Sequence, residues 1–70
     1  MVMIVFINDK ELEIFMGARV QDAILAYSQK SFNLVQQGKM AIFDRFGNLT
    51  DLDGSLTNGQ RLTLKRIKIL

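Results

Sequence analysis

The chain has 70 residues, of which 49% are hydrophobic, and a formal net charge of +2, so we expect one domain spanning residues 1–70. It contains neither Cys nor His, which excludes disulfides, the usual structural zinc site and nucleophile–base pairs built on these residues. A net charge this small does not by itself indicate a nucleic-acid partner.

The first two predicted elements form a β-hairpin. Residues 2–7 are rich in β-branched and aromatic side chains without helical spacing, which predicts a strand. The pair Asn8-Asp9 then supplies turn residues, and residues 10–16 alternate as a half-buried strand does. One face of this second strand carries Leu12, Ile14 and Met16, and the other carries Glu11, Glu13 and Phe15. Phe15 is therefore an aromatic residue on an otherwise polar face.

A helix is predicted after Gly17, beginning at about Val20. Its apolar residues are spaced to form one stripe, which consists of Val20, Ala23, Ile24 and Tyr27. Farther along, the pattern fits either one helix over residues 20–37 or a break near residues 29–31. We prefer the break, with a second short helix from about Lys30 to Gln37, because two Ser residues there could cap it. Gly38 is a good residue to follow the helix end.

The last part of the chain contains two more predicted strands, over residues 39–46 and 61–68. The loop over residues 50–56 is expected to be pinned by Leu52 and Leu56, and Asn58-Gly59 predicts a tight turn. The alternation slips at Ile67, which indicates a bulge or the end of regular pairing. The resulting order is ββαββ, an α+β class with a mixed sheet of about four strands packed on one main helix.

This order is that of the β-grasp, or ubiquitin-like, fold. Within that fold, residues 3–9 (MIVFIND), 17–20 (GARV) and 56–62 (LTNGQRL) resemble the small sulfur-carrier proteins of thiamine and molybdopterin synthesis. They also resemble TGS domains, which are attached to some synthetases and GTPases. The resemblance spans nearly all of the chain, although each motif is weak when taken alone.

One departure bears on function. Sulfur carriers of this kind end in Gly-Gly, whose terminal carboxylate is adenylated and converted to a thiocarboxylate. This sequence ends Ile67-Lys68-Ile69-Leu70, so carrier chemistry would require a natural chain that continues past Leu70. The TGS resemblance implies RNA binding as a further alternative.

The function that we expect from the sequence is a non-catalytic protein–protein interaction module or small subunit. One sheet face should pack on the helix, and the other should carry Phe15 with alternate residues of the first strand, either Met3, Val5 and Ile7 or their neighbours. An apolar patch of this kind usually marks an interface. The candidate interaction residues are Val5, Phe15, Phe43, Arg61, Lys65, Arg66 and Lys68.

The expected partner is a protein, with a homo-oligomer as one possibility and RNA as the alternative, for which the basic residues would contact phosphates. We expect no catalytic residue, cofactor or metal site, since residues 51–54 (DLDG) lack the first and twelfth ligands of a calcium-binding EF-hand loop. The apolar run before Asn8 has neither a basic start nor a cleavage site, and no stretch reaches the ~20 apolar residues of a membrane helix. We therefore expect a cytoplasmic protein without a membrane partner.

Overall fold

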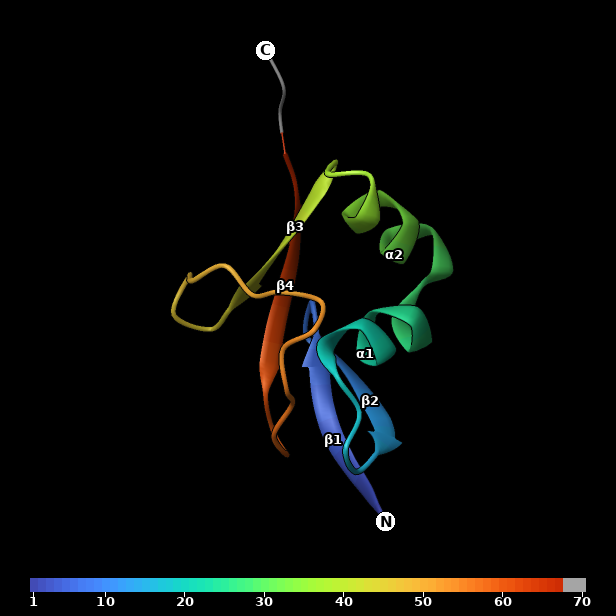
Figure 1. Cartoon of the computed structure of the whole chain (residues 1–70). Helices are drawn as coiled ribbons and strands as arrows, with labels where there is room; N and C mark the ends of the chain where they lie inside the picture. Colours follow the sequence, from blue (N-terminus) through green and yellow to red (C-terminus); the bar gives the residue numbers. More distant parts are fainter. Residues whose placement is uncertain (68–70) are drawn as a thin grey trace.

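The computed structural model describes residues 1–67, which form four strands and two helices. Along the chain these are β1 (Val2–Ile7), β2 (Lys10–Phe15), α1 (Val20–Tyr27), α2 (Gln29–Gln36), β3 (Met40–Asp44) and β4 (Arg61–Arg66) (Figure 1). The strands form one mixed sheet in the order β2-β1-β4-β3, with β1 and β4 parallel and the other neighbours antiparallel. This arrangement confirms the predicted α+β class, the ββαββ order and the second short helix.

The hairpin of β1 and β2 closes through the predicted turn at Asn8-Asp9. Both turn residues have positive φ angles, 50° and 68°, as in the type I′ turns whose twist suits two-residue hairpin loops. Asn8 also joins the hairpin to β4, because its Oδ1 accepts a hydrogen bond from the Leu64 N–H at 2.9 Å. The turn therefore fixes both the hairpin register and the parallel neighbour of β1.

The two helices are separated at Ser28, close to the break that the sequence predicted. Ser28 has an extended backbone, and its Oγ accepts a hydrogen bond from the Ser31 N–H at 3.2 Å, which caps α2. At the other end Gly38 has φ 76°, and the Lys39 N–H donates to the Leu34 carbonyl at 2.9 Å. This is the hydrogen bond of a Schellman motif, which requires a left-handed residue and so favours glycine.

Helix α1 begins without a good N-cap side chain, since Arg19 is the preceding residue. The loop over residues 50–56 replaces the missing cap with backbone carbonyls. The Val20 N–H donates to the Gly54 carbonyl, and the Gln21 N–H donates to another carbonyl of this loop, both at 2.9 Å. These are two of the N–H groups that a helix leaves free at its start, so the loop holds α1 in place.

The structure corrects the predicted ends of the last two strands. β3 was expected to reach Phe46 but ends at Asp44, because the Asp44 Oδ1 accepts hydrogen bonds from the Phe46 and Asn48 N–H groups at 2.8 and 2.9 Å. This carboxylate holds the turn that leaves the sheet. β4 ends at Arg66, and Ile67, which was predicted to continue it, lies beyond the strand, while the predicted end at Lys68 lies outside the described residues.

The turn at Asn58-Gly59 brings the chain back beside β1. Gly59 has φ 85°, and its N–H donates to the Ile4 carbonyl, while the Asn58 Oδ1 accepts from the Ile4 N–H at 2.8 Å. The turn therefore extends the pairing beside β1 to the residues that precede β4 in the chain. The predicted turn is confirmed, although it leads into a parallel neighbour rather than a hairpin.

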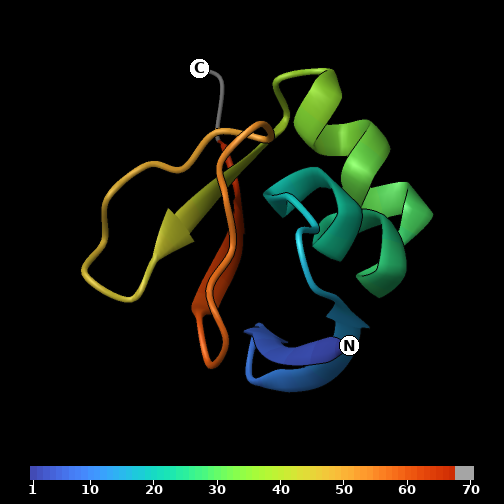
Figure 2. The ribbon, with the colours of Figure 1, turned by 60° about the horizontal axis from the view of Figure 1, so that its bottom comes forward.

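The core lies between the sheet and a layer made of the two helices and the loop over residues 50–56 (Figures 1 and 2). Leu52 and Leu56 of the loop are partly buried against this core, as predicted. The buried apolar residues are Met3, Val5, Ile7, Ile14, Ala18, Val20, Ala23, Ile24, Ile42, Leu62 and Leu64. In the described part of the chain, every buried residue is apolar.

Val5 was predicted to lie on the exposed face of the sheet, and this prediction is wrong. Its side chain is 0% exposed. The hairpin register explains why, because Val5 pairs with Leu12 and Met3 pairs with Ile14, and paired residues point to the same face. The apolar side of β2 therefore fixes which side of β1 is buried.

Candidate interaction surface

The sheet has a second face, opposite the helices, which carries the strand residues that do not point into the core. We call it the outer face. Because side chains of a strand point alternately to its two sides, the buried set on one side determines the outer set on the other. From β2 across to β3, the outer face consists of Glu11, Glu13, Phe15, Val2, Ile4, Phe6, Arg61, Thr63, Lys65, Ala41 and Phe43.

An apolar patch occupies the β1 and β2 side of the outer face. Val2 and Phe15 pair directly across the two strands and are 58% and 56% exposed. Ile4 and Phe6 continue the patch along β1 and are half-buried by their neighbours in the sheet. The patch therefore joins two strongly exposed apolar side chains to two partly covered ones.

Charged side chains of opposite sign lie on opposite sides of β1. Glu11 and Glu13 belong to the edge strand β2, whereas Arg61 and Lys65 belong to β4. In the register of the sheet, Phe6 pairs with Glu11 on one side and with Arg61 on the other. The strands that carry these charges are thus separated by β1, whose outer side chains are apolar, and the Arg61 guanidinium reaches over Phe6 of β1.

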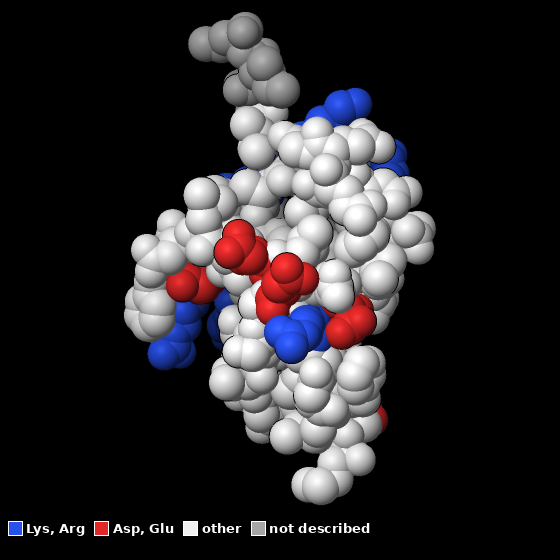
Figure 3. Space-filling view, in the orientation of Figure 1, with Lys and Arg blue, Asp and Glu red and all other residues white. Residues whose placement is uncertain are grey.

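We define the acidic half of the outer face as its β1–β2 part and the basic half as its β4–β3 part. On the helix side, by contrast, acidic and basic side chains lie side by side near the start of α1 (Figure 3). The cations of the basic half lie over aromatic rings, that of Arg61 over a ring of the neighbouring β1 and that of Lys65 over a ring of β3. The Arg61 guanidinium lies 4.2 Å from the centre of the Phe6 ring, and the Lys65 Nζ lies 5.7 Å from that of Phe43, which are cation–π distances.

Arg61 has one further contact, with Asp9 in the hairpin turn. The two charged groups are 3.6 Å apart, and their side chains are 52% and 96% exposed. An ion pair this exposed contributes only about 0–1 kcal/mol. Arg61 is therefore free to exchange Asp9 for another carboxylate.

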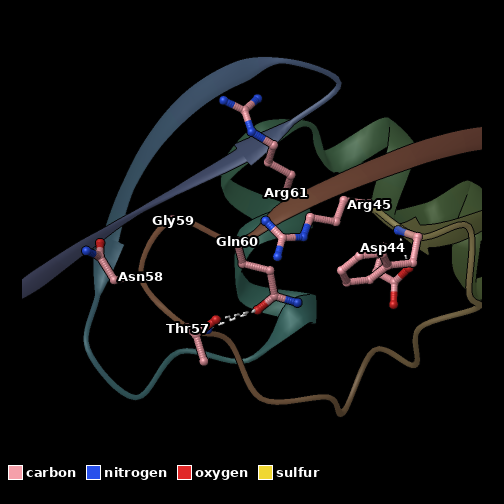
Figure 4. A pocket seen from close by; sticks show the side chains of 8 residues that line it. Asp44, Arg45, Thr57, Asn58, Gly59, Gln60 and Arg61 are labelled. Atoms are coloured by element: carbon pink, nitrogen blue, oxygen red, sulfur yellow. Dashed lines mark hydrogen bonds between the residues drawn. The ribbon is translucent and has the colours of Figure 1, made fainter.

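A hollow of about 340 Å³ lies beside the basic half, between the turn after β3 and the turn before β4. Arg45 and Arg61 both line it, as does Phe46, which is 74% exposed (Figure 4). The Arg45 guanidinium lies 4.8 Å from the centre of the Phe46 ring. The hollow thus adds a second arginine and an exposed aromatic residue to the basic end of the molecule.

Asp44 also lines this hollow, but its carboxylate is engaged by its own turn. Hydrogen bonds from backbone N–H groups, first that of Asn48, hold the pKa of Asp44 below its ordinary value, and partial burial opposes them only in part. A carboxylate with a lowered pKa stays ionised at neutral pH and is a poor general acid or base there. Asp44 is therefore a turn former rather than a reacting group.

The structure separates the residues that the sequence proposed for this surface. Phe15 and Phe43 lie on the outer face, the first exposed and the second half-buried, and Arg61 and Lys65 form the basic half. Arg66 is exposed but alternates with Lys65, so it lies on the other side of the strand. Val5 belongs to the core, and the predicted Lys68 lies outside the described residues.

Sequence reasoning missed Val2, Ile4 and Phe6 as definite members, since it left open which side of the first strand was buried. It also did not assign Glu11 and Glu13 to an interaction surface, although their alternation with Leu12 indicated that they faced away from the core. The sequence placed Arg45 and Phe46 at the end of the strand predicted over residues 39–46 and gave no signal for them as functional residues. Their approach to Arg61 depends on the fold.

Within residues 1–67, no group of three or more acidic side chains is placed so that it could hold a metal ion. None of the helices in the same range has the length and apolar character needed to cross a membrane. No model of a known protein family matches the sequence, and no curated protein matches it. Function is therefore inferred from the outer face itself.

Proposed function

We propose that the chain is a non-catalytic protein–protein interaction module that binds its partner through the outer face. The observation that carries this proposal is the exposure of the cross-strand pair Val2 and Phe15, which continues into Ile4 and Phe6. Contiguous exposed apolar surface marks interaction sites in proteins of this size. Aromatic residues surrounded by charged groups are also typical of interface centres and their rims.

The non-catalytic part of the proposal is supported by where the ionisable groups lie. In the described chain no charged side chain is buried, and the one carboxyl with a clearly lowered pKa, Asp44, holds a turn. Catalytic groups usually show strongly shifted pKa values in a cleft. The parallel pairing of β1 with β4 further supports a β-grasp relationship, in which the sheet opposite the helix is free to bind.

RNA binding is the second candidate, and the hollow beside the basic half favours it. Arg45 and Arg61 line this hollow and lie over aromatic rings, and both side-chain types bind single-stranded nucleic acid. Affinity for RNA would fall steeply as salt is raised, because counterions are released. A salt-insensitive interaction that requires Phe15 would favour the protein partner.

The test immobilises the wild-type chain and two variants and compares the proteins that each of them retains. Phe15→Ser removes the exposed aromatic residue of the outer face, whereas Leu25→Ser removes an apolar residue of α1 that is 38% exposed. We expect proteins that are retained by the wild type and by Leu25→Ser to be lost with Phe15→Ser. Circular dichroism melting would show that both variants are folded.

Equal retention by wild type and Phe15→Ser would contradict the proposal. A partner whose binding depends on Leu25 rather than on Phe15 would also contradict it, because Leu25 lies on the helix side. The identity of the retained protein would come from mass spectrometry, and direct titration of that purified protein would give the affinity of each variant.

A further inference from the structure

The separation of charge on the outer face makes this surface complementary to itself. The acidic half presents Glu11 and Glu13 next to exposed apolar side chains, and the basic half presents Arg61 and Lys65 over aromatic rings. A surface divided in this way attracts a second surface of the same kind when opposite halves meet. It repels one when like halves meet.

We infer that the partner of the outer face is a second copy of this chain, in a dimer that rests on the proposed interaction function. The acidic half of each protomer lies against the basic half of the other. A two-fold axis produces the two acidic–basic contacts together, because in such an interface a contact from the first protomer to the second is repeated from the second to the first.

Charge favours the orientation in which opposite halves meet over the one in which like halves meet, although both would bury the same area. If like halves met, Glu11 and Glu13 would lie near the same residues of the partner, and the two basic halves would also meet. Such juxtapositions disfavour an interface. Arg61 can reach across to the partner because its present contact with Asp9 is an exposed 3.6 Å pair, which is weak.

The size of the face predicts a weak dimer. Four strands about 4.8 Å apart and about six residues long at about 3.3 Å per residue cover roughly 400 Å² per protomer. Stable interfaces bury about 800 Å² per partner, so we expect a dimer that forms only at high protein concentration. The chain should therefore be monomeric in dilute solution and dimeric at millimolar concentration.

Charge inversion in each half tests the inference. The first variant is Glu11→Lys/Glu13→Lys, and the second is Arg61→Glu/Lys65→Glu. In sedimentation equilibrium at low salt, each variant alone should associate at least about tenfold more weakly than wild type, because both halves then carry the same sign. An equimolar mixture of the two should associate again, since every inverted half meets its opposite.

The matched control is Asp51→Lys/Asp53→Lys, which makes the same change of charge in the loop on the helix side. It should dimerise as wild type does, so an effect of net charge alone would be detected. Arg61→Gln/Lys65→Gln provides a milder change, with weakened association and without the risk that new carboxylates repel Asp9. Melting curves confirm that each variant is folded.

A wild-type chain that remains monomeric at millimolar concentration would overturn the dimer, as would inverted variants that associate like wild type or a mixture that does not associate. These results are distinct from failure of the proposed function. If the wild type is monomeric but a protein is retained in a Phe15-dependent manner, only the dimer is refuted. If neither association nor Phe15-dependent binding occurs, both are refuted.

Discussion

Two valines on β1 test directly which face of the sheet is buried. Val5 is 0% exposed in the core and Val2 is 58% exposed on the outer face. Each is changed to Ala, so the same atoms are removed from the same strand and the change of strand propensity is common to both. The difference between the two variants therefore reports burial.

The expected magnitudes follow from the lost apolar contacts. Removal of two buried methyl-sized groups at about 0.8 kcal/mol each costs about 1.6 kcal/mol, and the cavity raises this to about 2–3 kcal/mol for Val5→Ala. Val2 has less than half of its surface buried, so Val2→Ala should cost about 0.5 kcal/mol. A chain of this length has a free energy of unfolding of about 4–10 kcal/mol, so the first loss is a large part of the total.

Urea denaturation followed by circular dichroism measures both effects. With a slope of about 1 kcal/mol/M, the midpoint should fall by about 2 M or more for Val5→Ala and by about 0.5 M for Val2→Ala, with the slope unchanged. Equal shifts, or a larger shift for Val2→Ala, would refute the assignment of the two faces.

Three further predictions concern the turns and caps. Ser28→Ala should lower the free energy of unfolding by about 1 kcal/mol through loss of the α2 cap, and Ser28→Asp, which keeps an acceptor, should lose much less in the same urea assay. Gly38→Ala should cost about 1 kcal/mol because φ is 76° there, whereas Gly38→Asn should cost less, and equal costs would argue against the Schellman geometry. Because the folded pKa of Asp44 is lowered, its carboxylate stabilises the fold above the unfolded pKa, and this contribution is lost as pH falls through the folded pKa. The stability difference between wild type and Asp44→Ala should therefore be constant near neutral pH and shrink in acid, and a difference that grew in acid would contradict the turn.

Much of the fold could be predicted because its local signals agree with one another. The turn at Asn8-Asp9, the alternation of residues 10–16 and the glycine after α2 each specify one local geometry. The break between the helices was also predictable, since Ser28 is a good cap. Element order then followed from the order of these signals along the chain.

The buried side of β1 could not be predicted from its own residues. Residues 2–7 are apolar at every position, so neither parity stands out. Pairing with β2 decides the matter, because Ile14 and Leu12 of that strand face the core. The choice of Val5 failed for this reason.

The charge pattern of the outer face also depends on tertiary structure. Glu11 and Arg61 are 50 residues apart in sequence numbering, and only the strand order β2-β1-β4-β3 places them on either side of Phe6. The overall charge of +2 gives no sign of this separation. A local reading of the sequence therefore identified basic residues on the last strand but not their acidic complement.

The measurement that most directly tests the outer face as the binding surface is methyl NMR of the chain, free and bound. The bound state is either the chain itself at millimolar concentration or a protein retained in a Phe15-dependent manner. We expect the methyl signals of Val2 and Ile4 on the outer face to shift, while those of Leu25, which is exposed on α1 of the helix side, remain in place. A shift of the Leu25 signals, with those of Val2 and Ile4 unchanged, would contradict the outer face as the binding surface.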